Sequence, residues 1–88
     1  MVPLKILSKP KPGYTDSART KGKQGTVVLA VLFGANGRIE GTLLLNRLGY
    51  GLDEQAMSAA RRIKFEPKTV GGKPVPVVRM VEYSFAVY

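Results

Sequence analysis

The sequence predicts a small α+β domain in which two helices pack on one face of a three-stranded antiparallel sheet, in the order α-β-β-α-β. Two valine- and leucine-rich runs, 25–33 and 38–46, flank an Asn-Gly pair, which is typical of a hairpin. Residues 52–65 show helical spacing of apolar residues, and a third valine-rich run closes the chain. A chain of 88 residues has room for one core only.

The N-terminal segment 1–13 contains three of the six prolines. We expect it to be extended and to form an arm or the end of a linker, with the domain itself spanning 14–88. Leu4 and Ile6 alternate with a lysine, so a short edge strand is possible there.

The segment 14–22 is expected to form a short helix. Thr15 can accept a hydrogen bond as N-cap, and Asp16 suits the positive end of the helix dipole. Gly22 suits the position just after the last turn, where a left-handed conformation is common.

The first two strands form the predicted hairpin, turning at Asn36-Gly37, where both residues tolerate positive φ. The alternating residues of the first strand, from Val27 to Phe33, are expected to face the core. On the returning strand we expect Ile39, Leu43 and Leu45 to share that face.

The second helix is predicted over 52–65, with a stripe of small and apolar residues that would let it lie close on the sheet. Its acidic residues occupy the first turn and its basic residues the last, as the helix dipole favours. Arg61 and Arg62 are therefore interpreted as a solvated helix end. Pro67 prevents continuation, and Gly71-Gly72 is expected to serve a turn.

The last strand is predicted over 75–87, with alternate residues from Val77 to Val87 on one side. The hairpin can pair with only one of its edges, so the other edge is expected to be open. The N-terminal arm or a second copy of the domain could cover that edge. Tyr83 and Phe85 are interpreted as core residues rather than contact residues.

Composition excludes several kinds of site. There is no cysteine and no histidine, which rules out disulfides, the usual zinc sites and His-dependent catalysis. No carboxylate pair stands out, so we expect neither an enzyme nor a cofactor nor a metal site. The net charge of +8 favours acidic or polyanionic partners, or simply keeps the protein dispersed. We expect no membrane-spanning run and no signal peptide.

Several short motifs together resemble the C-terminal domain of TonB, the energy transducer of bacterial envelopes. Each motif is short, but their order and spacing match the family from about Pro10 to Phe85. The matching motifs are Pro12-Gly13-Tyr14-Thr15 with Ala18-Arg19, Gly25 to Val31, Asn36-Gly37, Leu52-Asp53-Glu54-Gln55-Ala56, Ala60 to Pro67, and Gly72-Lys73-Pro74-Val75. Thr15 stands where the family usually has a proline.

The resemblance implies a non-enzymatic periplasmic adaptor. Its parent protein would be anchored in the inner membrane by an N-terminal helix and driven there by ExbB and ExbD proteins. The domain would grip the Ton box of TonB-dependent outer-membrane receptors and transmit the pull that admits siderophores or cobalamin. Pairing would use the last strand, which could also form a homodimer. The implied contacts are Val77, Val78, Arg79, Met80, Val81, Glu82, Tyr83, Ser84 and Phe85, with Tyr14 and Arg19 near the first helix.

Strand addition needs main-chain donors, so Val81→Pro is expected to abolish binding by removing one. Two alternatives stay open. One is a TonB-like domain reused in another envelope protein, such as a motility or sensor component. The other is a basic nucleic-acid-binding module, although the tyrosines do not gather on one strand as stacking platforms would. No nucleic acid is therefore expected as a partner. The N-terminal lysines are interpreted as solubilising, or as facing an acidic partner or peptidoglycan.

Overall fold

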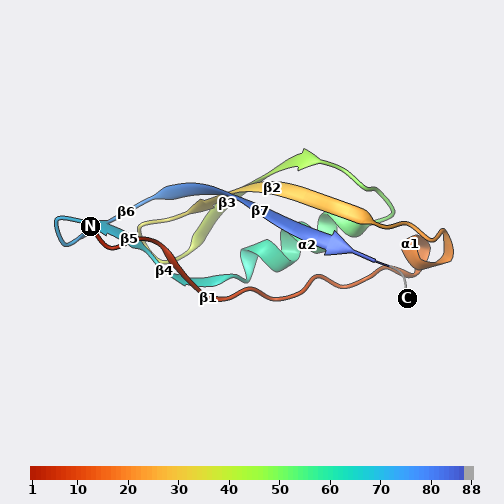
Figure 1. Cartoon of the computed structure of the whole chain (residues 1–88), viewed down its shortest axis with the longest axis horizontal. Coiled ribbons are helices and arrows are strands. Elements are labelled where there is room, and N and C mark those ends of the chain that lie inside the picture. Colours follow the sequence, from red (N-terminus) through yellow and green to blue (C-terminus); the bar gives the residue numbers. More distant parts are fainter. Residues whose placement is uncertain (87–88) are drawn as a thin grey trace.

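The computed structural model describes residues 1–86 and places nine elements along the chain (Figure 1). No helix within that range is long and apolar enough to cross a membrane. The elements are β1 (Lys5–Ser8), α1 (Asp16–Thr20), β2 (Gly25–Phe33), β3 (Ile39–Asn46), α2 (Leu52–Arg61), β4 (Lys64–Glu66), β5 (Lys68–Val70), β6 (Lys73–Val75) and β7 (Val77–Phe85).

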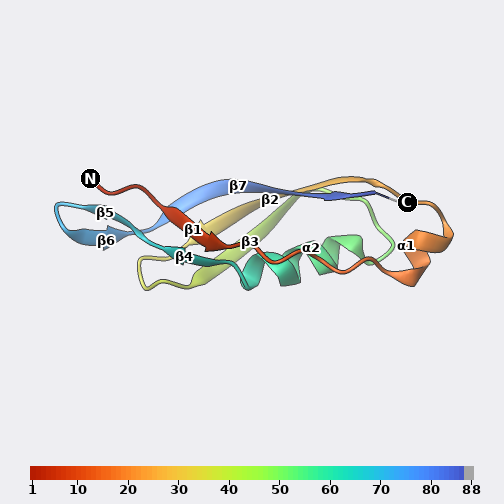
Figure 2. The same cartoon turned by 60° about the horizontal axis from the view of Figure 1, so that its bottom comes forward.

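The central sheet has the order β3-β2-β7, and both of its pairings are antiparallel. Helix α2 lies along one face of this sheet, and α1 lies at one end of it (Figure 2). The α+β class and the three-stranded sheet predicted from the sequence are confirmed. Strand β1, which the sequence left as a possibility, pairs with β4, and β5 pairs with β6; the short strands β4, β5 and β6 are not predicted from the sequence.

The core forms where α2 meets the sheet. Ala56, Ala59 and Ala60 are fully buried, so their small side chains let the helix approach the strands closely. The rings of Phe33 and Phe65 meet edge to face, with centroids 4.9 Å apart. The inward side of β2 is also fully or almost fully buried, as predicted, at Val27, Leu29, Val31 and Phe33.

The predicted inward face of β3 is wrong for two of its three residues. Leu43 and Leu45 are 63% and 48% exposed, whereas Leu44 packs against the core. The reason is a bulge near the hairpin, where Leu32 pairs with Gly41 and Phe33 with Ile39. The extra residue there, Glu40, reverses the faces of Leu43 and Leu44. A second irregularity, where Val28 pairs with Asn46 and Leu29 with Leu44, leaves Leu45 as another unpaired residue, and strict alternation counted from Ile39 therefore fails.

The predicted end of the second helix is also wrong. Helix α2 ends at Arg61, and Lys64–Glu66 forms strand β4 instead of a last helical turn. Pairing with β1 explains the change, since Ile6 lies opposite Phe65 and turns that ring into the core. The possible edge strand in the arm is therefore real, and it runs from Lys5 to Ser8.

Two turns are built as the sequence indicated, with one difference. In the β2–β3 hairpin only Gly37 has a positive φ, of 83°, and Asn36 instead accepts a bond from the Arg38 amide at 3.0 Å. Gly71 and Gly72 have φ of 58° and 79° and close the β5–β6 hairpin. That hairpin takes in Val75, so the last strand begins at Val77; the predicted inward Val87 lies outside the described residues.

A buried carboxylate fixes the loop that leads into α2. The Asp53 side chain is 6% exposed and accepts bonds from the Leu48 amide at 2.8 Å and the Gly49 amide at 3.0 Å. Gly49, Tyr50 and Gly51 all have positive φ, so the chain bends sharply here before the helix begins. Asp53 therefore holds this bend, beyond the dipole role inferred from the sequence.

Candidate functional site: the open edge of β7

Strand β7 lies at one edge of the central sheet. All nine of its residues pair with β2, from Val77 opposite Phe33 to Phe85 opposite Gly25. Within residues 1–86 no strand pairs with its other side. The open edge expected from the sequence is therefore present.

The side-chain contacts reveal which backbone groups point outward. The Lys9 ammonium donates to the Glu82 carbonyl at 2.9 Å from the side away from β2. The amide and carbonyl of one residue in an antiparallel strand point the same way, and successive residues alternate. The outward groups therefore belong to Val78, Met80, Glu82 and Ser84.

Contacts on strand β2 independently show which backbone groups of β7 point inward and which point outward. The Asn46 side chain accepts from the Val28 amide and donates to the Thr26 carbonyl, so the even-numbered groups of β2 point toward β3. Its odd-numbered groups then meet the odd-numbered groups of β7, among them Val81 opposite Leu29. The expectation that Val81→Pro removes an edge donor is wrong, because the Val81 amide belongs to the internal ladder with β2 and not to the edge.

The odd-numbered residues of β7 mostly serve the core. Val81, Tyr83 and Phe85 are 5%, 4% and 5% exposed, which confirms the interpretation of Tyr83 and Phe85 as core residues. Arg79 has the same phase but is exposed, since it lies nearer the β5–β6 end of the strand. The even-numbered Val78 and Met80 are well exposed on the opposite face of the sheet.

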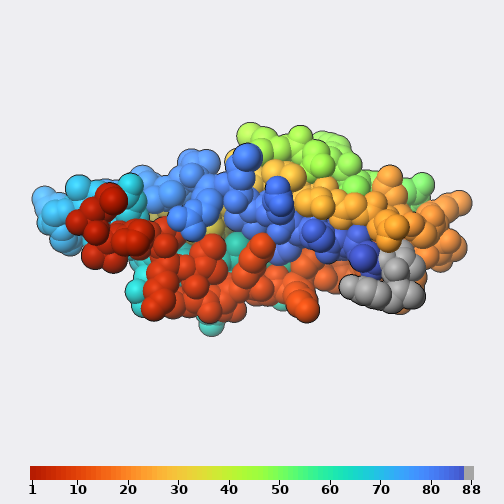
Figure 3. Space-filling model, viewed as in Figure 1, coloured from red at the N-terminus to blue at the C-terminus, as the bar shows by residue number. Residues whose placement is uncertain are grey.

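The arm lies alongside the C-terminal half of β7 without pairing with it (Figure 3). Between them runs a groove of about 520 Å³, lined by Lys9, Pro10, Lys11, Pro12, Tyr14, Glu82, Tyr83, Ser84, Phe85 and Ala86. The Lys9 ammonium also sits 4.8 Å from the centre of the Tyr83 ring. Two of the arm residues in the groove are prolines, which have no amide hydrogen to donate, so the arm is poorly suited to close the edge as a strand.

Tyr14 joins the first helix to the end of β7. Its ring meets Phe85 edge to face at 5.8 Å between centroids, and its hydroxyl donates to the Lys23 carbonyl. The Arg19 guanidinium lies over this ring, 5.8 Å from its centre, and forms an ion pair with Asp16 at 4.0 Å. Tyr14 therefore lines the groove, whereas Arg19 contacts Tyr14 but does not line the groove.

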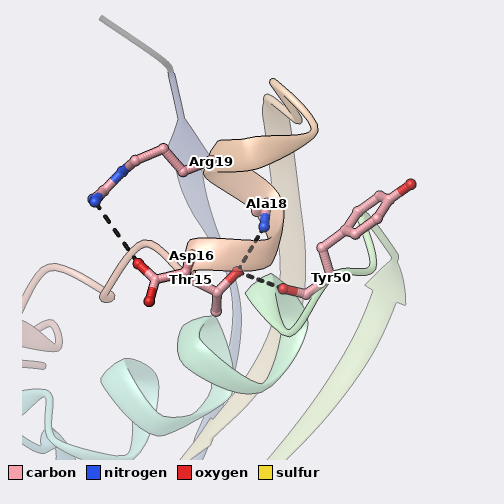
Figure 4. A network of polar contacts seen from close by, with 5 residues as sticks. All are labelled: Thr15, Asp16, Ala18, Arg19 and Tyr50. Atoms are coloured by element: carbon pink, nitrogen blue, oxygen red, sulfur yellow. Dashed lines mark hydrogen bonds and ion pairs between the residues drawn. The ribbon is translucent and has the colours of Figure 1, made fainter.

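Helix α1 is held in place by its predicted N-cap (Figure 4). The Thr15 hydroxyl accepts from the Ala18 amide at 3.2 Å and donates to the Tyr50 carbonyl at 2.5 Å. One side chain therefore caps the helix and ties it to the loop before α2. This contact fixes the end of the groove that Tyr14 forms.

One polar atom near the groove has no partner. The Tyr83 hydroxyl is buried and makes no hydrogen bond within residues 1–86. Burial raises the pKa of this hydroxyl above its ordinary value, and the Arg62 guanidinium partly opposes that effect.

Sequence reasoning missed the arm residues of the groove. Residues 1–13 are predicted as an extended arm or the end of a linker, and Lys9, Pro10, Lys11 and Pro12 are not among the predicted contacts, yet they form one wall of the groove. The alternation of proline and lysine was the available signal, because it marks a chain that stays extended but cannot donate at every second position.

Known proteins resemble this chain over nearly its whole length. A profile described as "Gram-negative bacterial TonB protein C-terminal" matches residues 10–87. The chain belongs to the TonB C-terminal domain family. Protein TonB of Vibrio cholerae serotype O1 is 32% identical over 74 residues, which are 83% of this chain and 30% of that protein. The chain thus spans about a third of that relative.

The fold of this TonB C-terminal domain also has a solved counterpart. The solution NMR structure of the Pseudomonas aeruginosa TonB C-terminal domain superposes with a TM-score of 0.76 at 26% identity. The match covers 96% of this chain and 86% of the other. The likeness therefore includes the arm as well as the sheet and helices.

Proposed function

We propose that this domain is a non-enzymatic periplasmic adaptor that binds the Ton-box segment of outer-membrane receptors by adding it as a strand to β7. Membership of the TonB C-terminal family supports the transducer role. The single observation that carries the binding site is the outward row of backbone groups at Val78, Met80, Glu82 and Ser84. Strand addition uses such groups and demands little of the partner's sequence.

The groove favours the C-terminal half of the edge as the place where binding begins. An incoming strand would enter between β7 and the arm and would take the Glu82 carbonyl from Lys9. Tyr14 would border its end, and Arg19 would act by holding Tyr14. Arg79 and the Glu82 side chain, both exposed, are the polar side chains of β7 best placed to contact it.

The same edge suits pairing with a second copy of the domain. We propose that the homodimer and the peptide complex compete, since both would use the same four outward residues. In the full-length protein the domain would follow an inner-membrane helix driven by ExbB and ExbD proteins. Its pull would then open receptors for siderophores or cobalamin.

A ¹⁵N-HSQC titration with a synthetic Ton-box peptide tests the proposal. We expect the largest shifts at the outward amides of Val78, Met80, Glu82 and Ser84, and smaller shifts at the inward amides between them. The same peptide in scrambled order serves as control for backbone-only binding, and a short oligonucleotide tests general attraction of anions. Shifts confined to α1 or to the β5–β6 hairpin would overturn the assignment to β7.

A further inference from the structure

A second surface gathers cations from three separate parts of the chain. The turn of the β2–β3 hairpin contributes Arg38, the end of α2 contributes Arg61 and Arg62, and β4 contributes Lys64. Together with Ser8, Pro10, Gly37, Ile39 and Ile63 they line a depression of about 620 Å³. We call this surface the basic depression. Figure 2 shows the hairpin turn, the end of α2 and β4 at the same end of that helix.

The basic depression holds four formal positive charges and no carboxylate among its lining residues. All four cationic side chains are exposed, and the only ion pair within residues 1–86 is Asp16–Arg19, which lies on α1. These side chains make a single hydrogen bond within residues 1–86, a long one of 3.4 Å from Arg62 Nε to the Ser58 carbonyl. Their guanidinium and ammonium donors are thus free of protein acceptors, apart from that contact.

Two features of the surroundings oppose an anion, and neither cancels the four charges. The C-terminus of α2 carries about half a negative charge, and that effect falls off within the last turn. Glu40 lines a small neighbouring hollow together with Arg61, but it does not reach ion-pair distance. The net field in the basic depression therefore stays positive.

We propose that the basic depression binds an acidic peptide segment of a partner protein. Three of its four cations are arginines, whose planar guanidinium groups bind carboxylates through paired hydrogen bonds. The Ser8 hydroxyl and the Gly37 backbone add uncharged polar groups at the rim. The apolar contribution is small, from Pro10, Ile39 and Ile63, so charge rather than hydrophobic burial would dominate binding.

Nucleic acid and membrane fit this surface less well. No aromatic residue lines the basic depression, so unpaired bases would find no stacking platform. Few apolar groups are available to insert into a bilayer, since only Pro10, Ile39 and Ile63 line the basic depression and Ile63 is buried. The site is also separate from the open edge of β7, since Pro10 is the only residue that lines both hollows. The inference therefore does not depend on the proposed function.

The test is a ¹⁵N-HSQC titration of the whole chain with a short peptide of alternating glutamate and glycine, with the glutamine counterpart as uncharged control. We expect shifts at Arg38, Arg61, Arg62 and Lys64, no shifts with the glutamine peptide, and weaker binding as salt rises. Arg61→Gln combined with Arg62→Gln should weaken binding about tenfold, because two charge-assisted contacts are lost. Arg38→Gln should weaken it about threefold and lies outside the helix, so it tests the site without altering α2.

A matched control separates this site from net charge. Lys21→Gln combined with Arg47→Gln removes the same charge from exposed positions elsewhere and should change the affinity less than about twofold. Equal weakening by the control pair would overturn the proposal, as would shifts that follow β7 instead. Tighter binding of a single-stranded oligonucleotide than of the glutamate peptide, at the same residues, would also overturn it in favour of nucleic acid.

Discussion

Replacing Met80 by proline tests which backbone amides of β7 point outward at its open edge. The Met80 amide points away from β2, and its side chain is 66% exposed, so proline here removes one edge donor and little packing. An incoming strand would lose one main-chain hydrogen bond and leave one of its own carbonyls without a partner. At a solvated edge this costs about 1–2 kcal/mol, which weakens peptide binding roughly 5- to 30-fold.

Two further variants serve as controls. One separates the effect of the Met80 amide from that of its side chain, and the other separates an amide at the open edge from an amide bonded to β2. Met80→Ala keeps the amide and should bind the peptide within about twofold of the parent chain. Val81→Pro removes a donor to Leu29 inside the sheet and should cost about 1–3 kcal/mol of folding free energy, because the Leu29 carbonyl loses its partner. The total stability of a small domain is about 5–15 kcal/mol, so that loss is large enough to measure by unfolding.

Peptide affinity is measured by fluorescence anisotropy of a labelled Ton-box peptide, and folding by circular dichroism during urea unfolding. The reasoning is refuted if a folded Met80→Pro binds like the parent chain. It is equally refuted if Met80→Ala loses as much affinity as Met80→Pro, because the side chain would then be the cause. A stable Val81→Pro that no longer binds would show that the phase of the edge is the reverse of the one inferred here.

Three further changes probe other contacts. Lys9→Ala frees the Glu82 carbonyl and should raise peptide affinity about two- to fivefold by calorimetry, whereas an unchanged or lower affinity would mean that the arm does not compete. Asp53→Asn replaces an acceptor of two amides and should lower the free energy of unfolding by about 1–3 kcal/mol in urea titration; a loss under about 0.5 kcal/mol would contradict that role. Tyr83→Phe removes an unpaired buried hydroxyl and should leave stability unchanged or higher at pH 7. Burial raises the pKa of Tyr83 above its unfolded value, so the parent chain keeps its stability below about pH 10 and loses some of it as pH rises further. The Tyr83→Phe variant should lose less stability in that range, and an equally steep loss would exclude Tyr83 as the cause.

Sequence patterns were sufficient for the elements whose signals are local. Strand β2 has the predicted bounds, Thr15 caps α1, and the stripe of alanines on α2 is buried. These features depend on the alternation of apolar residues, on capping side chains and on side-chain size, all of which can be read directly from the sequence.

The features that were missed depend on pairing between distant segments. The bulge opposite Leu32 shifts Leu43 outward, and nothing local to β3 marks it except Gly41. Phe65 leaves the helical pattern because β1 pairs with it, and β1 lies some sixty residues earlier. Which amides of β7 face outward likewise follows only from the contacts of Lys9 and Asn46, since alternation alone cannot tell which set of amides faces the neighbouring strand.

The extended path of the arm along the molecule has a mechanical consequence. The arm runs most of the length of the 50 Å molecule, from the end that holds the β5–β6 hairpin to α1 at the other end (Figure 1). Thirteen fully extended residues reach at most about 45 Å, so the arm is largely extended. Tension along the long axis would load the Val2–Thr69 and β1–β4 bonds in shear, all together rather than one after another. If those bonds broke, the arm would pass the load to α1 at the far end, where Tyr14 contacts Phe85 at the end of β7. A domain built in this way can transmit force before any part of it lengthens.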